Sequence, residues 1–166
     1  MRIETERLFM IPISYEFVCD KISGKETELE RNGIRFNNNY WQESELAEIL
    51  PIFKGQLKGK NIDGFSPWLI VLKGDNRVIG NCGCHGEPDD NNEVEIGYEI
   101  DADCRKRGYA KEAVKALVDW LIRDKQVSNV SAECGIDNIA SIKLLKYIEM
   151  LEIDRDSEFI YWKLFR

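Results

Sequence analysis

The sequence predicts an α/β fold of the α+β kind, with a mixed, mostly antiparallel central sheet flanked by helices. Short apolar runs of strand length and amphipathic stretches follow one another in the order β-α-α-β-β-β-α-β-α-β-β, which differs from the strict alternation of a doubly wound sheet. Hydrophobic residues make up 43% and charged residues 32% of the 166 residues, values typical of a globular chain. No repeat or linker-like tract divides the sequence, so we expect a single domain over residues 1–166.

The first half begins with one strand and two helices. Residues 7–13 form an apolar run that ends near a proline, which suits a strand at the edge of a sheet. Ser14 is a candidate N-cap, and apolar residues recur at helical spacing over residues 15–30 and 44–57. Pro51 lies inside the second of these segments, so we expect a kink or a break there.

Three consecutive strands come next. Residues 68–72 are apolar, residues 73–76 are typical of a turn, and residues 77–84 are again strand-like, which predicts a β-hairpin. Apolar and polar side chains alternate in residues 93–100, so this segment is expected to be a third antiparallel strand.

The remaining chain predicts two helices and three strands. The strongest helical pattern covers about residues 107–123, where one face carries Ala110, Val114, Leu117 and Leu121. A strand over residues 127–135, a helix that ends near residue 147, and strands over residues 150–153 and 159–165 follow.

Charge and cysteine content narrow the class of protein. The net charge of −7 and the pI near 4.9 disfavour nucleic-acid binding. No apolar run is long enough to span a membrane and the first residues do not resemble a signal peptide, so we expect a cytoplasmic protein. The five cysteines are expected to be reduced, and Cys82-Gly83-Cys84-His85 offers too few ligands for zinc, so no metal is expected.

A basic turn stands where the strongest helix begins. Arg105, Lys106 and Arg107 precede Gly108, and a helix start presents free N–H groups and the positive end of the helix dipole. The turn is therefore a candidate site for a phosphate or pyrophosphate group, and the alternative is an ordinary solvated basic turn. Neither a P-loop motif nor a dinucleotide-binding glycine motif is present.

The same turn carries a family resemblance. Arg105-x-x-Gly108-x-Ala110 matches the [Q/R]-x-x-G-x-[G/A] pyrophosphate loop of the GNAT superfamily of acetyl-CoA-dependent N-acetyltransferases. Three further segments resemble the branch that acetylates ribosomal-protein N-termini (RimJ/RimL type): Thr5-Glu6-Arg7-Leu8, Glu95-Ile96-Gly97-Tyr98 and Asn138-Ile139-Ala140-Ser141. Each motif is weak alone, but the four occur in the right order and the resemblance covers essentially the whole chain.

The resemblance implies that acetyl-CoA is the co-substrate and lies in a cleft where the strands over residues 93–100 and 127–135 splay apart. The pantetheine arm would pair with the backbone near Ile100 and Ala102 and with the side chain of Asn138. The pyrophosphate would contact the N–H groups of the segment that comprises Arg105, Lys106, Arg107, Gly108, Tyr109, Ala110 and Lys111.

Amine acetylation needs a base for the amine proton and stabilisation of the leaving thiolate. Glu95 is the candidate base; the alternative is a solvated acidic face. Gly97 nearby indicates a bulge or a close approach to the strand, at the point where the resemblance places the thioester. Ser141 is the candidate acid, with an ordinary first-turn residue as the alternative. Many members of the superfamily place a tyrosine acid four residues later, where this chain has Leu145.

The acceptor side is expected to include Phe36, Tyr40, Trp41 and Tyr98, although core packing explains the first three equally well. Residues 87–103 contain eight carboxylates and no Lys or Arg, which would steer a cationic amine or simply aid solubility.

The expected activity is direct acetyl transfer to a primary amine, either a protein N-terminus or a small molecule, by a monomer or homodimer. The alternative is a non-catalytic acyl-CoA-binding or regulatory module, which Leu145 and Glu149 favour. Cys104, next to the basic turn, is a candidate reactive thiol.

Overall fold

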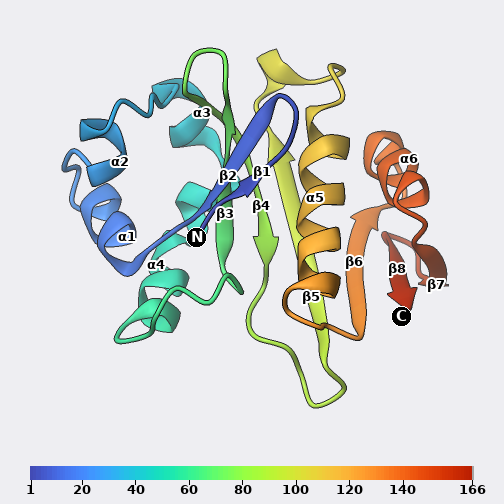
Figure 1. The fold of residues 1–166 in the computed structure, drawn as a ribbon. Coiled ribbons are helices and arrows are strands. Elements are labelled where there is room, and N and C mark those ends of the chain that lie inside the picture. The colour runs from blue at the N-terminus through green and yellow to red at the C-terminus, as the bar shows by residue number, and fades with distance from the viewer. Residues whose placement is uncertain (166) are drawn as a thin grey trace.

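An eight-stranded sheet forms the centre of the protein in a computed structural model that describes residues 1–165, the side chains of residues 38 and 39 excepted (Figure 1). The strand order is β1-β2-β3-β4-β5-β6-β8-β7, and every neighbouring pair is antiparallel except β5 and β6. The strands are β1 (Ile3–Glu4), β2 (Leu8–Pro12), β3 (Pro67–Leu72), β4 (Arg77–Cys84), β5 (Glu93–Ile100), β6 (Asn129–Gly135), β7 (Leu151–Arg155) and β8 (Phe159–Phe165). The predicted fold class is confirmed.

Helices cover both faces of the sheet (Figure 1). One face packs against the layer that contains α1 (Tyr15–Ile22), α2 (Glu28–Arg31), α3 (Asn38–Glu43) and α4 (Glu45–Leu57). The other packs against α5 (Tyr109–Arg123) and α6 (Ile139–Tyr147). Adjacent residues of β2 show the alternation that produces two cores: Leu8 packs on the α5 side and Phe9 on the α1 side.

Several predicted boundaries are wrong for local reasons. The single helix expected over residues 15–30 is two helices, because Gly24 adopts a left-handed φ of 66° after α1 and Thr27 forms a capping box with Glu30 that starts α2. Pro51 does not break α4, which continues to Leu57. The strongest predicted helix begins two residues late, at Tyr109, because Gly108 is left-handed and serves as its N-cap.

The parallel seam between β5 and β6 is short. The two strands pair only at Glu93 with Asn129, Val94 with Val130 and Glu95 with Ser131. Beyond these positions β5 stays on β4 and β6 stays on β8, so the two strands separate within the sheet. The splay expected from the resemblance is therefore present. In the described part of the chain no helix is both long and apolar enough to cross a membrane.

Candidate active site

The separation of β5 from β6 leaves an unusual edge inside the sheet. Residues 96–100 of β5 keep their antiparallel register with β4, while no described strand pairs with their other side. A strand edge without a partner presents N–H and C=O groups that an extended, amide-containing ligand can bind. Ile100 and Ala102 lie at the open end of this gap, and the Ile100 carbonyl accepts a hydrogen bond of 2.9 Å from Arg105 Nε.

The basic turn follows directly after the open edge. A short 3-10 helix, η1 (Ala102–Cys104), leads into Arg105, and Lys106 and Gly108 then adopt left-handed φ values of 60° and 82°. Left-handed residues in such a turn direct successive N–H groups toward one side, which makes a concave site for an anion. Gly108 caps the 15-residue α5 without a side-chain hydrogen bond, so the first-turn N–H groups stay available to a ligand.

The turn residues are exposed, as an anion site requires. Residues 105–108 are exposed, Tyr109 and Ala110 are half-buried, and Lys111 is exposed on the first turn of α5. Cys104 is 1% exposed and packs in the larger core, so solvent reagents do not reach its Sγ in the folded protein.

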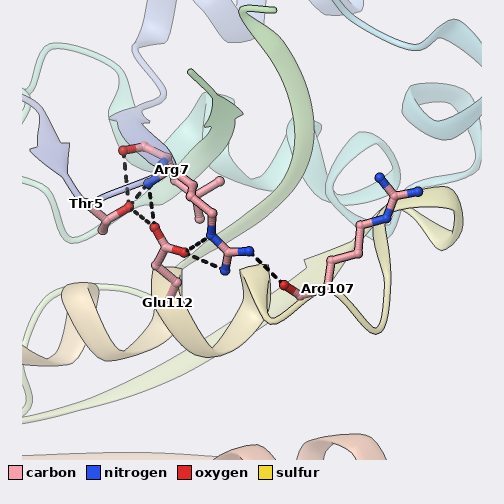
Figure 2. A network of polar contacts seen from close by, with 5 residues as sticks. Thr5, Arg7, Arg107 and Glu112 are labelled. Carbon is pink, nitrogen blue, oxygen red and sulfur yellow. Dashed lines mark hydrogen bonds and ion pairs between the residues drawn. The ribbon is translucent and has the colours of Figure 1, made fainter. Parts of the chain in front are cut away.

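A polar network ties this turn to the N-terminal strands (Figure 2). Arg7 Nε and Nη2 each lie 2.7 Å from Glu112 Oε2, while Thr5 Oγ1 (2.6 Å) and the Arg7 backbone N–H (2.8 Å) donate to Oε1. Arg7 Nη1 also donates to the carbonyl of Arg107 at 2.9 Å, and its guanidinium covers the Tyr109 ring. Arg7 thus connects the body of the protein to the backbone of the turn.

Glu112 is charged in this network. Burial acts to raise the pKa of its carboxyl group, but the hydrogen bonds from Thr5 and Arg7 and the charge of Arg7 outweigh it and lower the pKa below its ordinary value. Sequence analysis did not assign a role to Arg7 or to Glu112. The available signal was the Thr5-Glu6-Arg7-Leu8 motif, which matched the family without a known purpose.

A carboxylate and an imidazole lie together at the last paired position of the seam: Glu95 is on β5, and His85 directly follows β4. Glu95 Oε1 lies 3.3 Å from His85 Nδ1, and the backbone N–H of His85 donates to the backbone carbonyl of Glu95 at 3.0 Å. A Cβ on Gly97 would lie 2.8 Å from His85 Nε2, so the imidazole occupies the space that this glycine leaves open. In this structure His85, a residue that sequence analysis discussed only as a metal ligand, is therefore the group that lies against Gly97.

The other end of the same face of β5 is also acidic. Asn81 Nδ2 donates to Tyr40 Oη at 3.3 Å and to Glu99 Oε2 at 3.4 Å. Burial, followed by the charge of Glu45, raises the pKa of Glu99. Burial and the charge of Glu99 raise the pKa of Tyr40 as well. Tyr40 therefore reaches the polar face of β5.

Phe36 and Trp41 lie elsewhere. Their rings meet edge to face at 5.3 Å and both pack on Phe17 in the smaller core, with Lys21 Nζ 3.7 Å from the centre of the Phe36 ring. The structure thus separates Tyr40, which approaches the splayed strand, from Phe36 and Trp41, which contribute to packing.

Tyr98 and Ser141 lie on the opposite side of the sheet, toward α5 and α6. Asn138 caps α6 by accepting the Ser141 N–H at 3.0 Å through Oδ1, which places Ser141 in the first turn. Tyr98 packs against the larger core, and Ser141 is close enough to influence its pKa. Leu145 is fully buried in that core.

Among residues 1–165, no group of three or more His, Cys, Asp or Glu side chains is arranged to hold a metal ion. The candidate site consists of an open strand edge, a basic turn at the start of α5 and a Glu95–His85 pair where the strands separate.

Comparison with known proteins identifies relatives among the acetyltransferases. The family model described as the acetyltransferase (GNAT) domain matches residues 26–150. The uncharacterized N-acetyltransferase YjdG of Bacillus subtilis (strain 168) is 30% identical over 161 residues, which cover 96% of this chain and 95% of that protein.

Solved structures share the fold at low identity. The ribosomal-protein-S5-alanine acetyltransferase from Vibrio fischeri superposes with a TM-score of 0.72 at 14% identity, over 99% of this chain and 96% of the other. RimL, an alpha-N-protein acetyltransferase in complex with coenzyme A, superposes with a TM-score of 0.67 at 15% identity, over 99% and 98% of the two chains. The family match and the 30% identity along nearly the whole chain show that this protein belongs to the GNAT acetyltransferase family.

Proposed function

We propose that this protein transfers an acetyl group from acetyl-CoA directly to a primary amine, with Glu95 as the base. The observation that carries the proposal is the position of the Glu95–His85 pair. It lies at the point where β5 and β6 separate, and the anion-binding turn lies at the other end of the same gap. A donor that spans the gap would have its phosphates at the turn and its thioester beside the pair.

The cofactor side of the site fits acetyl-CoA. The N–H groups of residues 105–111 and the start of α5 would bind the pyrophosphate, and the open edge of β5 from Gly97 to Ile100 would pair with the pantetheine amides. A depression of about 610 Å³ borders the turn. Its lining includes Lys111, while its other two basic side chains, Arg7 and Lys115, are paired with the carboxylates of Glu112 and Asp119. Bound there, acetyl-CoA supplies an activated acetyl group as a thioester.

The amine side would use Glu95 and His85. The neutral amine nitrogen forms a bond to the thioester carbonyl carbon, the C–S bond breaks and its electron pair leaves with sulfur. The Glu95 carboxylate takes the proton that the amine loses, directly or through one water molecule, and its contact with His85 provides a route for that proton to solvent. Both side chains are about half exposed, so the proton is not trapped in the interior.

The surroundings support a cationic, polar acceptor. The acidic stretch over residues 87–103 lies on and beside β5, and it attracts an ammonium group before deprotonation. A cavity of about 240 Å³ includes Gly86, the residue after His85, and is lined by Lys60, Asp63 and Glu87 among others. Its polar walls suit the remainder of a small amine or the first residues of a peptide. Two structural neighbours are named as acetyltransferases of ribosomal proteins.

The deciding experiment combines calorimetric titration with acetyl-CoA and detection of free thiol across a panel of peptides, polyamines, amino acids and aminoglycosides. Binding with acceptor-dependent thiol release supports the proposal and identifies the acceptor class. Binding without release from any acceptor supports a non-catalytic acyl-CoA-binding module instead, and absence of binding contradicts both.

Glu95→Gln tests the base. It should reduce kcat by about 100-fold, the usual range for loss of general-base catalysis, and leave the Kd for acetyl-CoA unchanged. Glu152→Gln makes the same charge change on the exposed strand β7 and should retain wild-type turnover. Equal turnover in both variants would rule out Glu95 as the base.

A further inference from the structure

Two glycines lie opposite each other where β5 leaves the seam. Gly83 of β4 pairs with Gly97 of β5, and Gly97 lies two residues beyond Glu95, the last residue of β5 that pairs with β6. Directly opposed residues of an antiparallel pair carry their side chains on the same face of the sheet. This face therefore lacks two neighbouring side chains, and the groups that take their place decide how much room a ligand has beside the open edge of β5.

Different groups occupy the space over the two glycines. A Cβ on Gly83 would lie 2.5 Å from the backbone carbonyl oxygen of Ser66. A Cβ on Gly97 would lie 2.8 Å from His85 Nε2, and its three nearest atoms all belong to the imidazole. The space over Gly83 is thus closed by backbone, whereas the space over Gly97 is closed by one side chain that a substitution can remove.

The imidazole is held over Gly97 by two contacts with Glu95. The backbone N–H of His85 donates to the Glu95 backbone carbonyl at 3.0 Å, which fixes the chain directly after β4. Glu95 Oε1 lies 3.3 Å from His85 Nδ1, which orients the ring and leaves Nε2 as the atom over Gly97. An oriented ring bounds the space beside it more sharply than a freely rotating side chain does.

The opposite face of β5 is filled by the larger core. Ile96 is 2% exposed and belongs to that core, and Tyr98 packs against it. A closely packed interior accepts additional methylene groups only at a cost in free energy. A group bound at the edge of β5 near Gly97 therefore has to extend over the face that carries His85.

We propose that the His85 imidazole limits the acyl group that this enzyme transfers, so that acetyl is accepted and longer acyl groups are rejected. The inference rests on the proposed function, in which the thioester lies beside the Glu95–His85 pair. An acetyl group has one methyl beyond its carbonyl carbon, whereas a butyryl group has two further methylenes that must enter the space over Gly97. The bond changes are the same for every acyl group: the N–C bond forms, the C–S bond breaks, and its electron pair leaves with sulfur.

The expected discrimination follows from the size of one methylene group. A site that is bounded this closely changes kcat/KM by about 10- to 200-fold for one surplus methylene. With two surplus methylenes, the wild type should use butyryl-CoA at least about 100-fold less efficiently than acetyl-CoA. The cavity of about 240 Å³ is lined by Ser66 and by Gly86, the residue after His85, so removal of the ring would extend the acyl site toward space that is already present.

His85→Ala tests the inference, with His85→Phe as the matched variant that keeps a ring over Gly97 but cannot carry a proton. The His85 side chain is 54% exposed, so both variants should fold. The first readout is the ratio of kcat/KM for butyryl-CoA to kcat/KM for acetyl-CoA with one amine acceptor. Both variants lose the proton route through His85, but this loss affects the two donors equally and cancels in the ratio. We expect the ratio to rise at least about tenfold in His85→Ala and to change by less than about threefold in His85→Phe.

Binding gives a second readout that does not depend on turnover. Calorimetric titration measures the Kd of acetyl-CoA and of butyryl-CoA for each protein. Relative to the Kd of acetyl-CoA, the Kd of butyryl-CoA should be about tenfold lower in His85→Ala than in the wild type, as expected when two methylenes gain a place to bind. Glu95→Gln keeps the imidazole, so both ratios should stay close to those of the wild type.

The outcomes separate this inference from the proposed function. If acetyl-CoA does not bind the wild-type protein, the proposed function is wrong and the inference falls with it. If acetyl-CoA binds but the wild type uses butyryl-CoA equally well, or if both ratios are the same in His85→Ala and the wild type, the role of the imidazole alone is refuted. An equal rise in His85→Phe would also refute it, because the ring would then not be the group that excludes the longer chain.

Discussion

Glu112→Gln should loosen the attachment of the basic turn over residues 105–108 to the N-terminal strands. Glutamine keeps the oxygen that accepts from Thr5 and the Arg7 backbone, but it places an NH₂ group against Arg7 Nε and Nη2, which both lie 2.7 Å from Oε2. The Arg7 and Glu112 side chains are 42% and 17% exposed, so the pair lies between a buried charged contact and a surface ion pair. We expect a loss of about 1–2 kcal/mol in the free energy of unfolding.

The assay is thermal and urea unfolding of four proteins: the wild type, Glu112→Gln, Arg7→Gln and the double variant. For a chain of this size, a loss of about 1–2 kcal/mol in Glu112→Gln corresponds to a melting temperature lower by about 3–6 °C. Because Arg7 contacts the Arg107 carbonyl, Arg7→Gln should also weaken binding of acetyl-CoA by about tenfold. The cycle should give a coupling energy of about 1 kcal/mol, and a coupling near zero would refute the proposed attachment.

The Glu112→Gln variant also tests how the stability of the protein depends on pH. The folded protein holds the pKa of Glu112 below its ordinary value, so this stabilisation is complete above the unfolded pKa of about 4.3 and is lost as the pH falls through the lower, folded pKa. The difference in stability between the wild type and Glu112→Gln should therefore be constant near neutral pH and shrink below about pH 4.

The remaining predictions concern glycines and cysteines. Gly97→Ala should displace the His85 imidazole, since its Cβ would lie 2.8 Å from Nε2, and reduce turnover while the Kd for acetyl-CoA is unchanged; unchanged turnover would contradict the role of the pair. Gly108→Val should raise that Kd at least about tenfold, because a branched side chain at a φ of 82° strains the turn by about 1–2 kcal/mol; calorimetry checks this. A thiol reagent should modify Cys19, which is half-buried, before the four buried cysteines, as mass spectrometry of the labelled native protein would show.

Elements with a clear period were predictable from the sequence. Alternation predicted the buried face of β5, where Val94 and Ile96 pack in the larger core, and the apolar stripe predicted α5, where Val114 and Leu117 do the same. The break between α1 and α2 was missed because it depends on local backbone chemistry at Gly24 and not on periodicity.

The site was predictable where it is contiguous in sequence and not where distant segments meet. The turn over residues 105–108 combines basic residues, a glycine and a helix start, so its chemistry was visible directly. The contact between Arg7 and Glu112 joins residues 105 positions apart, and no local pattern encodes it. Gly97 did indicate a close approach, but only the register of β4 on β5 shows that His85 is the approaching group.

The three-residue seam between β5 and β6 links the stability of the protein to its ligand. The seam joins two half-sheets, and a molecule that hydrogen-bonds to the open edge of β5 completes the sheet much as an added strand would. A ligand that binds only the folded state adds about 2.7 kcal/mol to its stability at a concentration 100 times its Kd. If acetyl-CoA is that ligand, the unfolded fraction and the rate of proteolysis decrease as its supply increases, so the amount of enzyme in a cell would follow the availability of its own acetyl donor.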